Sequence, residues 1–104
     1  MITASFTKSN GKFQKFRING HSGYAAQGSD IVCAAVSAMA MLTINTATEG
    51  FKIPASVFAD EEGPVIEFEL ETEDERGCIL IAGLWQELAA LANDYPNNVR
   101  VTVK

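Results

Sequence analysis

The sequence has 104 residues, a formal net charge of −5 and an apolar content of 47%. This length predicts a single domain, 1–104, that can bury a modest core without disulfides, and the apolar content excludes a disordered chain. The acidic balance argues against direct nucleic-acid binding. One histidine and two cysteines are too few for a structural zinc site, so no metal and no other cofactor is expected.

The first fifth of the chain predicts a β-hairpin. Apolar and polar residues alternate over 1–8 and again over 12–19, which is the period of a half-buried strand. Asn10-Gly11 lies between them and favours a two-residue turn, because both residues tolerate positive φ. No apolar signal segment is present in residues 1–20, and two unpaired thiols suit a reducing compartment, so we expect a cytoplasmic protein.

A helix is predicted from about Asp30 to Thr48. Residues 31–48 contain no charged side chain and are rich in alanine, which is typical of a helix that is buried on most sides. Its strongly apolar part ends near Ile44 and is too short to span a bilayer. We therefore expect a core helix and no membrane partner.

The second half of the chain predicts three further strands and a second helix. The strands are expected over 51–58, with Pro54 at an edge or irregularity, over 65–71, and over 99–103. Thr72 with Glu75 three residues later forms a capping-box pattern, so the helix is expected to begin after Thr72 and to end near Asn93. Cys78 falls in its first turns and is interpreted as structural.

These elements follow the order strand, strand, helix, strand, strand, helix, strand. Hairpins joined by amphipathic helices favour an α+β two-layer domain. In it, a largely antiparallel sheet has both helices packed on one face.

One stretch, residues 20–37, combines the features of a reactive thiol. Asp30 is a preferred N-cap residue, which places Cys33 in the first turn of the helix, where the free N–H groups favour a thiolate. His21 stands at the other end of a loop that contains Gly23 and Gly28. The pattern indicates an activated cysteine with a nearby histidine. The alternative is that Cys33 only fills space in an apolar helix, as buried cysteines often do.

The same stretch resembles the ribosomal-processing cysteine protease family, Prp. The matching pattern is Gly20-His21, a glycine-bearing loop, and then Gly28-Ser29-Asp30-Ile31-Val32-Cys33-Ala34-Ala35-Val36-Ser37. The resemblance implies that His21 and Cys33 are the catalytic pair. It also implies a homodimer whose substrate is the precursor of a large-subunit ribosomal protein, number twenty-seven, with an N-terminal extension that the protease removes.

Several residues are expected to support acyl transfer to Cys33. His21 either takes the thiol proton or forms an ion pair with the thiolate, and it then protonates the leaving amine. Backbone N–H groups of Val32 and Cys33 are expected to hold the oxyanion. The supporting residues are Gly20, Asp30 and Ser37. Ser37 lies one helical turn after Cys33, and it either orients the thiol region or bonds back to a carbonyl. A flexible loop that rearranges around substrate is expected over residues 22–29, with Ser22, Gly23, Gly28 and Ser29 as its members.

Two other kinds of protein fit the residues. One is a non-catalytic ribosome-associated binding module in which Cys33 is buried, and the other is a redox-sensing thiol protein that cleaves no peptide. Charge distribution bears on the partner, because nine of the 13 acidic residues fall between Asp60 and Glu75. This segment either attracts a basic peptide or is an ordinary solvated surface.

Overall fold

The computed structural model describes residues 1–26 and 30–104 of the chain. Its elements, in chain order, are β1 (Ile2–Ser9), β2 (Lys12–Asn19), α1 (Ile31–Asn45), a π-helical turn η1 (Thr46–Gly50), β3 (Ala55–Asp60), β4 (Val65–Leu70), α2 (Glu75–Asp94) and β5 (Val99–Val103).

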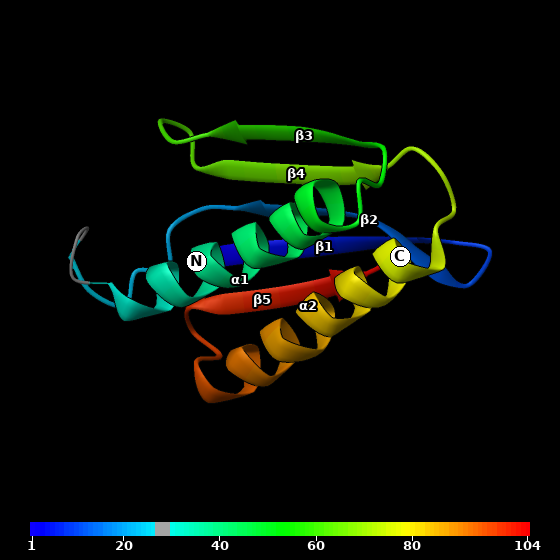
Figure 1. Ribbon diagram of the computed structural model, residues 1–104. Helices are drawn as coiled ribbons and strands as arrows, with labels where there is room; N and C mark the ends of the chain where they lie inside the picture. The colour runs from blue at the N-terminus through cyan, green and yellow to red at the C-terminus, as the bar shows by residue number, and fades with distance from the viewer. Residues whose placement is uncertain (27–29) are drawn as a thin grey trace.

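The five strands form one sheet in the order β3-β4-β2-β1-β5. All neighbouring pairs are antiparallel except β1 and β5, which are parallel. Both helices lie on the same face of this sheet (Figure 1). The predicted α+β two-layer architecture is therefore confirmed. The parallel pairing places the start of β5 beside the start of β1, since Ile2 is paired with Val99.

The core lies between the sheet and the two helices. Phe6, Phe16 and Phe68 are directly opposite one another on β1, β2 and β4, and their ring centroids are 5.9 and 5.5 Å apart. Ile81 and Leu88 of α2 are fully buried against this side of the sheet. Such a row of cross-strand aromatic side chains fixes the register, because a slip of one residue would turn all three rings to the open face.

The first hairpin forms where it was predicted. Asn10 and Gly11 have φ of 55° and 76°, the left-handed conformation that a two-residue hairpin turn requires.

The third strand begins four residues later than predicted, at Ala55 instead of Phe51. The helical path continues through η1, where the N–H of Phe51 donates to the carbonyl of Thr46, and Lys52 then leaves the helix with φ 56°. Ile53 is buried and its N–H donates to Ala47, so it packs under the helix end and does not join the sheet. Pro54 has no N–H to donate, and the edge strand begins after it.

The predicted N-cap of α2 at Thr72 is wrong. The cap is Asp74, whose carboxylate accepts the N–H of Arg76, and the helix begins at Glu75. The guanidinium of Arg76 also donates to this carboxylate, and mainly for this reason the pKa of Asp74 is lowered to about 2. A carboxylate two residues before Arg76 competes better for the free N–H groups than the more distant threonine hydroxyl.

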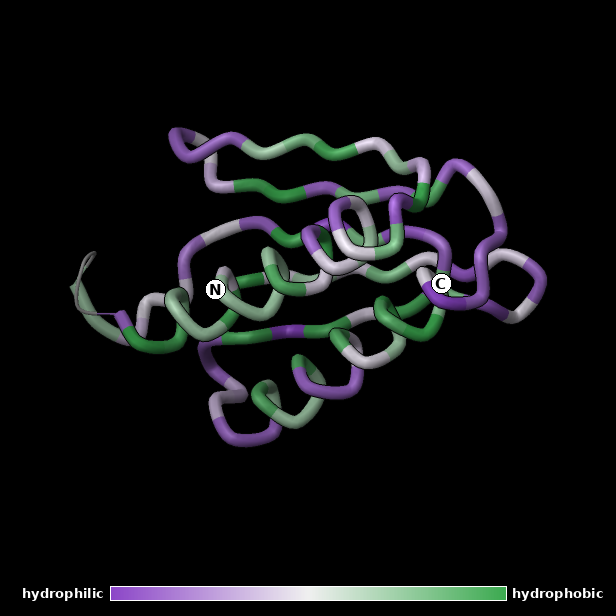
Figure 2. The backbone as a smooth tube through the Cα atoms, in the orientation of Figure 1, coloured by the Kyte–Doolittle hydropathy of each residue, from purple (hydrophilic) through white to green (hydrophobic). Residues whose placement is uncertain are grey.

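Helix α1 is apolar along its length, as the green and white segments of Figure 2 show. With η1 it forms a helical stretch of 20 residues, Ile31–Gly50, which is long and apolar enough to cross a membrane by length and composition alone. Val36, Ala40 and Ile44 point into the core, but the opposite face is exposed. Leu42, at 69% exposure, is the most exposed large apolar side chain among the described residues.

Candidate active site

The site lies where β2 ends and the chain passes to the start of α1. Gly20 follows β2 with φ 97°, and a side chain there would collide with the carbonyl oxygen of Met1. Its N–H donates to the carbonyl of Pro64 at 3.0 Å. Only glycine fits where the chain passes the carbonyl of Met1. Gly20 therefore fixes the point at which the chain leaves the sheet before His21.

Asp30 caps α1 as predicted. One carboxylate oxygen accepts the backbone N–H groups of Val32 and Cys33, each at 3.0 Å, and the other accepts the hydroxyl of Ser22. The Ser22 hydroxyl, and to a smaller extent the backbone N–H of Cys33, lower the pKa of Asp30 to about 2. Asp30 is therefore an anion that joins the loop to the helix start.

The same hydrogen bonds engage the groups that were expected to hold an oxyanion. Because the N–H groups of Val32 and Cys33 both donate to Asp30, neither is free for a substrate oxygen in this conformation. Asp30 is also directed at these N–H groups and at Ser22, and no described contact joins it to His21.

Ser22 is the residue that contacts the thiol. Its backbone N–H donates to the Cys33 sulfur at 3.3 Å, and its hydroxyl accepts the N–H of Tyr24 at 3.1 Å while donating to Asp30. Only 2% of Ser22 is exposed. Ser22 was expected to belong to a flexible loop. In this conformation hydrogen bonds on both sides hold it in the interior, and its rearrangement around substrate stays a prediction.

His21 precedes this buried serine and is itself exposed. No hydrogen bond joins its imidazole to Cys33 in the described part of the chain. The contact between the Ser22 N–H and the sulfur nevertheless places the backbone of His21 one peptide unit from the thiol. Cys33 is half-buried, so the sulfur is partly shielded and still near the surface.

The site includes a segment that the sequence did not reveal. The side-chain amide of Asn98 donates to the carbonyl of Ser22 at 2.9 Å, and the ring of Tyr95 meets that of Tyr24 edge to face at 5.4 Å. Both residues belong to the turn that leads into β5. Polar and aromatic residues after a helix are too common to signal a site 76 positions away in sequence.

Of the remaining predicted site residues, two are exposed and two lie outside the described part of the chain. Gly23 is exposed with φ 71°. Ser37 is exposed one turn after Cys33, and no hydrogen bond ties it to the thiol in the described part of the chain. Gly28 and Ser29 lie outside the described residues.

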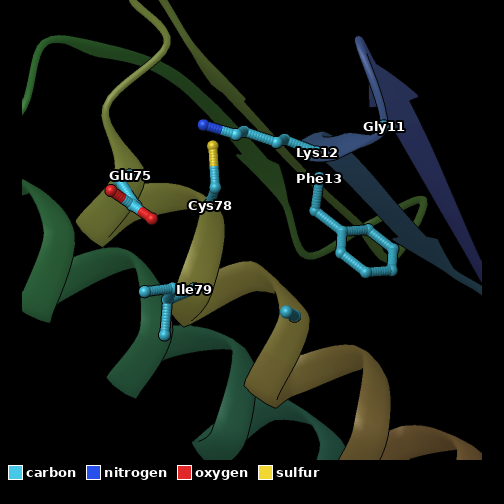
Figure 3. Close-up of a pocket in the computed structure, with 7 residues that line it drawn as sticks. Gly11, Lys12, Phe13, Glu75, Cys78 and Ile79 are labelled. Carbon is cyan, nitrogen blue, oxygen red and sulfur yellow. The ribbon is translucent and has the colours of Figure 1, made fainter.

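The second thiol has a different environment, shown in Figure 3. Cys78 lines a hollow at the start of α2, opposite Lys12 and Phe13 of β2, and only 5% of the residue is exposed. Burial raises the pKa of this thiol. Its position among core residues supports the structural role predicted from the sequence. The residues that the structure describes contain no cluster of three or more histidine, cysteine or acidic side chains suited to a metal ion.

Comparison with known proteins identifies the family. The family model for cysteine protease Prp matches residues 1–100. The chain belongs to the cysteine protease Prp family. It is 31% identical to the ribosomal processing cysteine protease Prp of Bacillus subtilis (strain 168), an alignment that covers 98% of this chain and 96% of that protein.

Solved structures have the same fold. The ribosomal processing protease Prp from S. aureus, in complex with a covalently linked product peptide, superimposes with a TM-score of 0.92 at 24% identity over the whole of both chains. The protein SMU.848 from Streptococcus mutans gives a TM-score of 0.84 at 28% identity and covers all of this chain and 96% of its own. Family membership makes this chain a cysteine protease and confirms the resemblance drawn from residues 20–37.

Proposed function

We propose that this chain is a cysteine endopeptidase of ribosome maturation. Its proposed substrate is the precursor of large-subunit ribosomal protein number twenty-seven, from which it removes the N-terminal extension. The observation that carries this proposal is the hydrogen bond between Ser22 and Cys33, because it brings the residue next to His21 onto a sulfur at the first turn of a helix. The name of the B. subtilis relative supports a role in ribosomal processing.

The proposed mechanism is acyl transfer through a Cys33–His21 dyad. His21 takes the thiol proton, and the thiolate attacks the scissile carbonyl carbon. The tetrahedral intermediate collapses to a thioester when His21 returns the proton to the leaving amine, and water activated by His21 then hydrolyses the thioester. We assign no oxyanion role to the N–H groups of Val32 and Cys33, since both donate to Asp30.

The test is incubation of the protein with the extended precursor, followed by mass measurement of the precursor's N-terminus. The parent protein should release the extension, and Cys33→Ala should release none. This variant should stay folded, because the truncation of one half-buried sulfur costs about 1 kcal/mol. Cys78→Ala is the matched control and should cleave normally.

Two outcomes contradict the proposal. Cleavage by a folded Cys33→Ala protein would exclude the proposed mechanism. Loss of cleavage in Cys78→Ala but not in Cys33→Ala would show that Cys78, and not Cys33, is the nucleophile. A parent protein that cleaves no precursor but is alkylated rapidly at Cys33 would instead support the redox-sensing alternative.

We further propose that the protein is a homodimer that associates through the exposed face of α1. The exposed residues of this face recur at alternating intervals of three and four: Ile31, Ala34, Ala38, Met41 and Asn45, with Leu42 beside them. This is the spacing by which one helix packs along another, and the two alanines allow close approach. We propose a cytoplasmic location, with a peptide substrate as the other partner and no direct binding of nucleic acid or membrane.

A further inference from the structure

The turn between α2 and β5 contacts the loop that carries His21 and Ser22 through a partly buried side-chain hydrogen bond that the proposed mechanism does not use. We propose that Asn98 is a positioning residue that holds the Ser22 N–H on the Cys33 sulfur and thereby stabilises the thiolate. The inference deepens the proposed function, on which it rests for the role of Cys33.

The backbone of Asn98 is fixed on three sides. Its own N–H donates to the carbonyl of Tyr95 at 3.0 Å, its carbonyl accepts the N–H of Ile2 at 2.8 Å, and Val99 after it is paired in the sheet. Its amide is therefore presented from a rigid part of the molecule. A hydrogen bond from a rigid element orders its partner more than one from a mobile surface side chain.

The partner of Asn98 is the carbonyl of Ser22, at 2.9 Å. Three further hydrogen bonds converge on Ser22, to the Cys33 sulfur, to Asp30 and from Tyr24. Of these three further bonds, those to Cys33 and Asp30 lead to the start of α1, and that from Tyr24 lies within the loop itself. Asn98 is the one described residue that ties Ser22 to the sheet by a side-chain hydrogen bond.

The consequence for the thiol follows from charge. A hydrogen bond to sulfur is stronger when the sulfur is an anion, so a fixed N–H favours the thiolate over the thiol. The donor is useful only if it stays in place when the thiol ionises. The titratable groups of the described residues around this point are Asp30 at the helix start, His21 and Tyr24 in the loop, Tyr95 in the turn, and the amino terminus at Met1, which precedes the Ile2 N–H bound to Asn98.

The test measures the rate of Cys33 alkylation by iodoacetamide as a function of pH. A Cys78→Ala background leaves Cys33 as the one thiol that can react. Asn98→Ala removes the donor without a change of charge. It should move the midpoint of the rate profile to higher pH and slow alkylation at pH 7 by roughly fivefold. Asn97→Ala is the matched control, because Asn97 is an exposed neighbour in the same turn and should leave the profile unchanged.

Cleavage of the peptide substrate gives a second readout. Asn98→Ala should lower kcat with little change in KM, since Asn98 acts on the nucleophile. If Asn98→Ala and Asn97→Ala give the same alkylation profile as the parent, the positioning role is overturned. Alkylation uses no peptide, so failure of the cleavage assay alone would count against the proposed function and not against this inference.

A third measurement uses the parent protein and so does not depend on a variant that folds. The NMR signal of the Ser22 amide proton should shift with pH at the same midpoint as Cys33 alkylation, because its acceptor changes charge. A Ser22 amide that does not respond over this transition would overturn the proposal.

Discussion

At the scale of single residues, the site is built around Ser22, whose neighbours come from the start of α1 and from the turn before β5. Asp30 stands at the start of α1, Cys33 lies one turn later, and Asn98 precedes β5. Each contact uses a different polar group of the serine. Ser22 thus satisfies its own buried polar atoms and orients the thiol, which is the property expected of a residue that is almost fully buried beside a reactive group.

The charge of Asp30 predicts a pH dependence of stability. Its pKa in the folded protein is about 2, against an ordinary value of 3.8. A carboxyl whose pKa is lowered by folding stabilises the protein above its unfolded pKa, so this contribution is present above about pH 4 and is lost as the pH falls toward 2. The free energy of unfolding, measured with urea from pH 6 to pH 2, should therefore decrease in that window.

Asp30→Asn should reduce this decrease, because the amide has no charge to lose. Asp74 has a similarly lowered pKa, so part of the slope should remain in Asp30→Asn and disappear only when Asp74→Asn is added. Asp94→Asn, at the exposed end of α2, is the control. A slope in Asp30→Asn equal to that of the parent would show that the ionisation of Asp30 adds no stability.

At the scale of elements, the start of α2 packs closely against β4. Gly77 is buried there, and a Cβ on it would lie 2.8 and 3.0 Å from the two methyl carbons of Leu70. Leu70 is itself only 3% exposed, so its methyl groups would have to shift within the core to admit a Cβ. Gly83 is in the same helix but is exposed, with nothing within 4 Å of its would-be Cβ.

This contrast predicts opposite effects of the same substitution. Gly83→Ala should raise the free energy of unfolding by about 0.5–1 kcal/mol, since alanine favours the helix and finds open space. Gly77→Ala should lower it by about 1–3 kcal/mol, because overpacking against Leu70 outweighs that gain. Urea unfolding measures both. Stabilisation by Gly77→Ala would mean that α2 can move away from β4 at little cost.

The elements themselves could largely be predicted from the sequence, because their signals are local. The alternation of β4 and the Asn10-Gly11 turn depend on adjacent residues, and both were predicted correctly. The start of β3 was not, because Ile53 has the character of a strand residue but is bound to the end of the helix by its N–H. Such a choice between two partners depends on tertiary packing, which the sequence pattern does not contain.

The same distinction applies to the site. His21, Asp30 and Cys33 lie within one short stretch and could be found from cap preference and motif. The buried position of Ser22 and the contribution of Asn98 depend on the parallel pairing of β1 with β5, which brings the last turn of the chain to the loop. Sequence alone gives no signal for that register.

At the scale of the whole molecule, the surface is uneven in apolar character. Exposed apolar side chains are isolated on α2, where Ile79 is 64% exposed, but on α1 they form a continuous face along the helix. Monomeric soluble proteins rarely expose a contiguous apolar surface of this kind. An identical face on a second copy would cover it by a symmetric contact.

The proposed dimer predicts the effect of one charge on that face. In size-exclusion chromatography with light scattering at micromolar concentration, the parent should have twice the chain mass of 11.2 kDa, and Leu42→Glu should have the chain mass. The variant should remain folded because Leu42 is 69% exposed, while burial of a carboxylate in the contact would be unfavourable. Ile79→Glu, which adds the same charge at a similarly exposed position of α2, should remain dimeric.

A monomeric parent would exclude the dimer. Sedimentation of that monomer with neutral phospholipid vesicles would show instead that the exposed face of α1 binds a membrane surface.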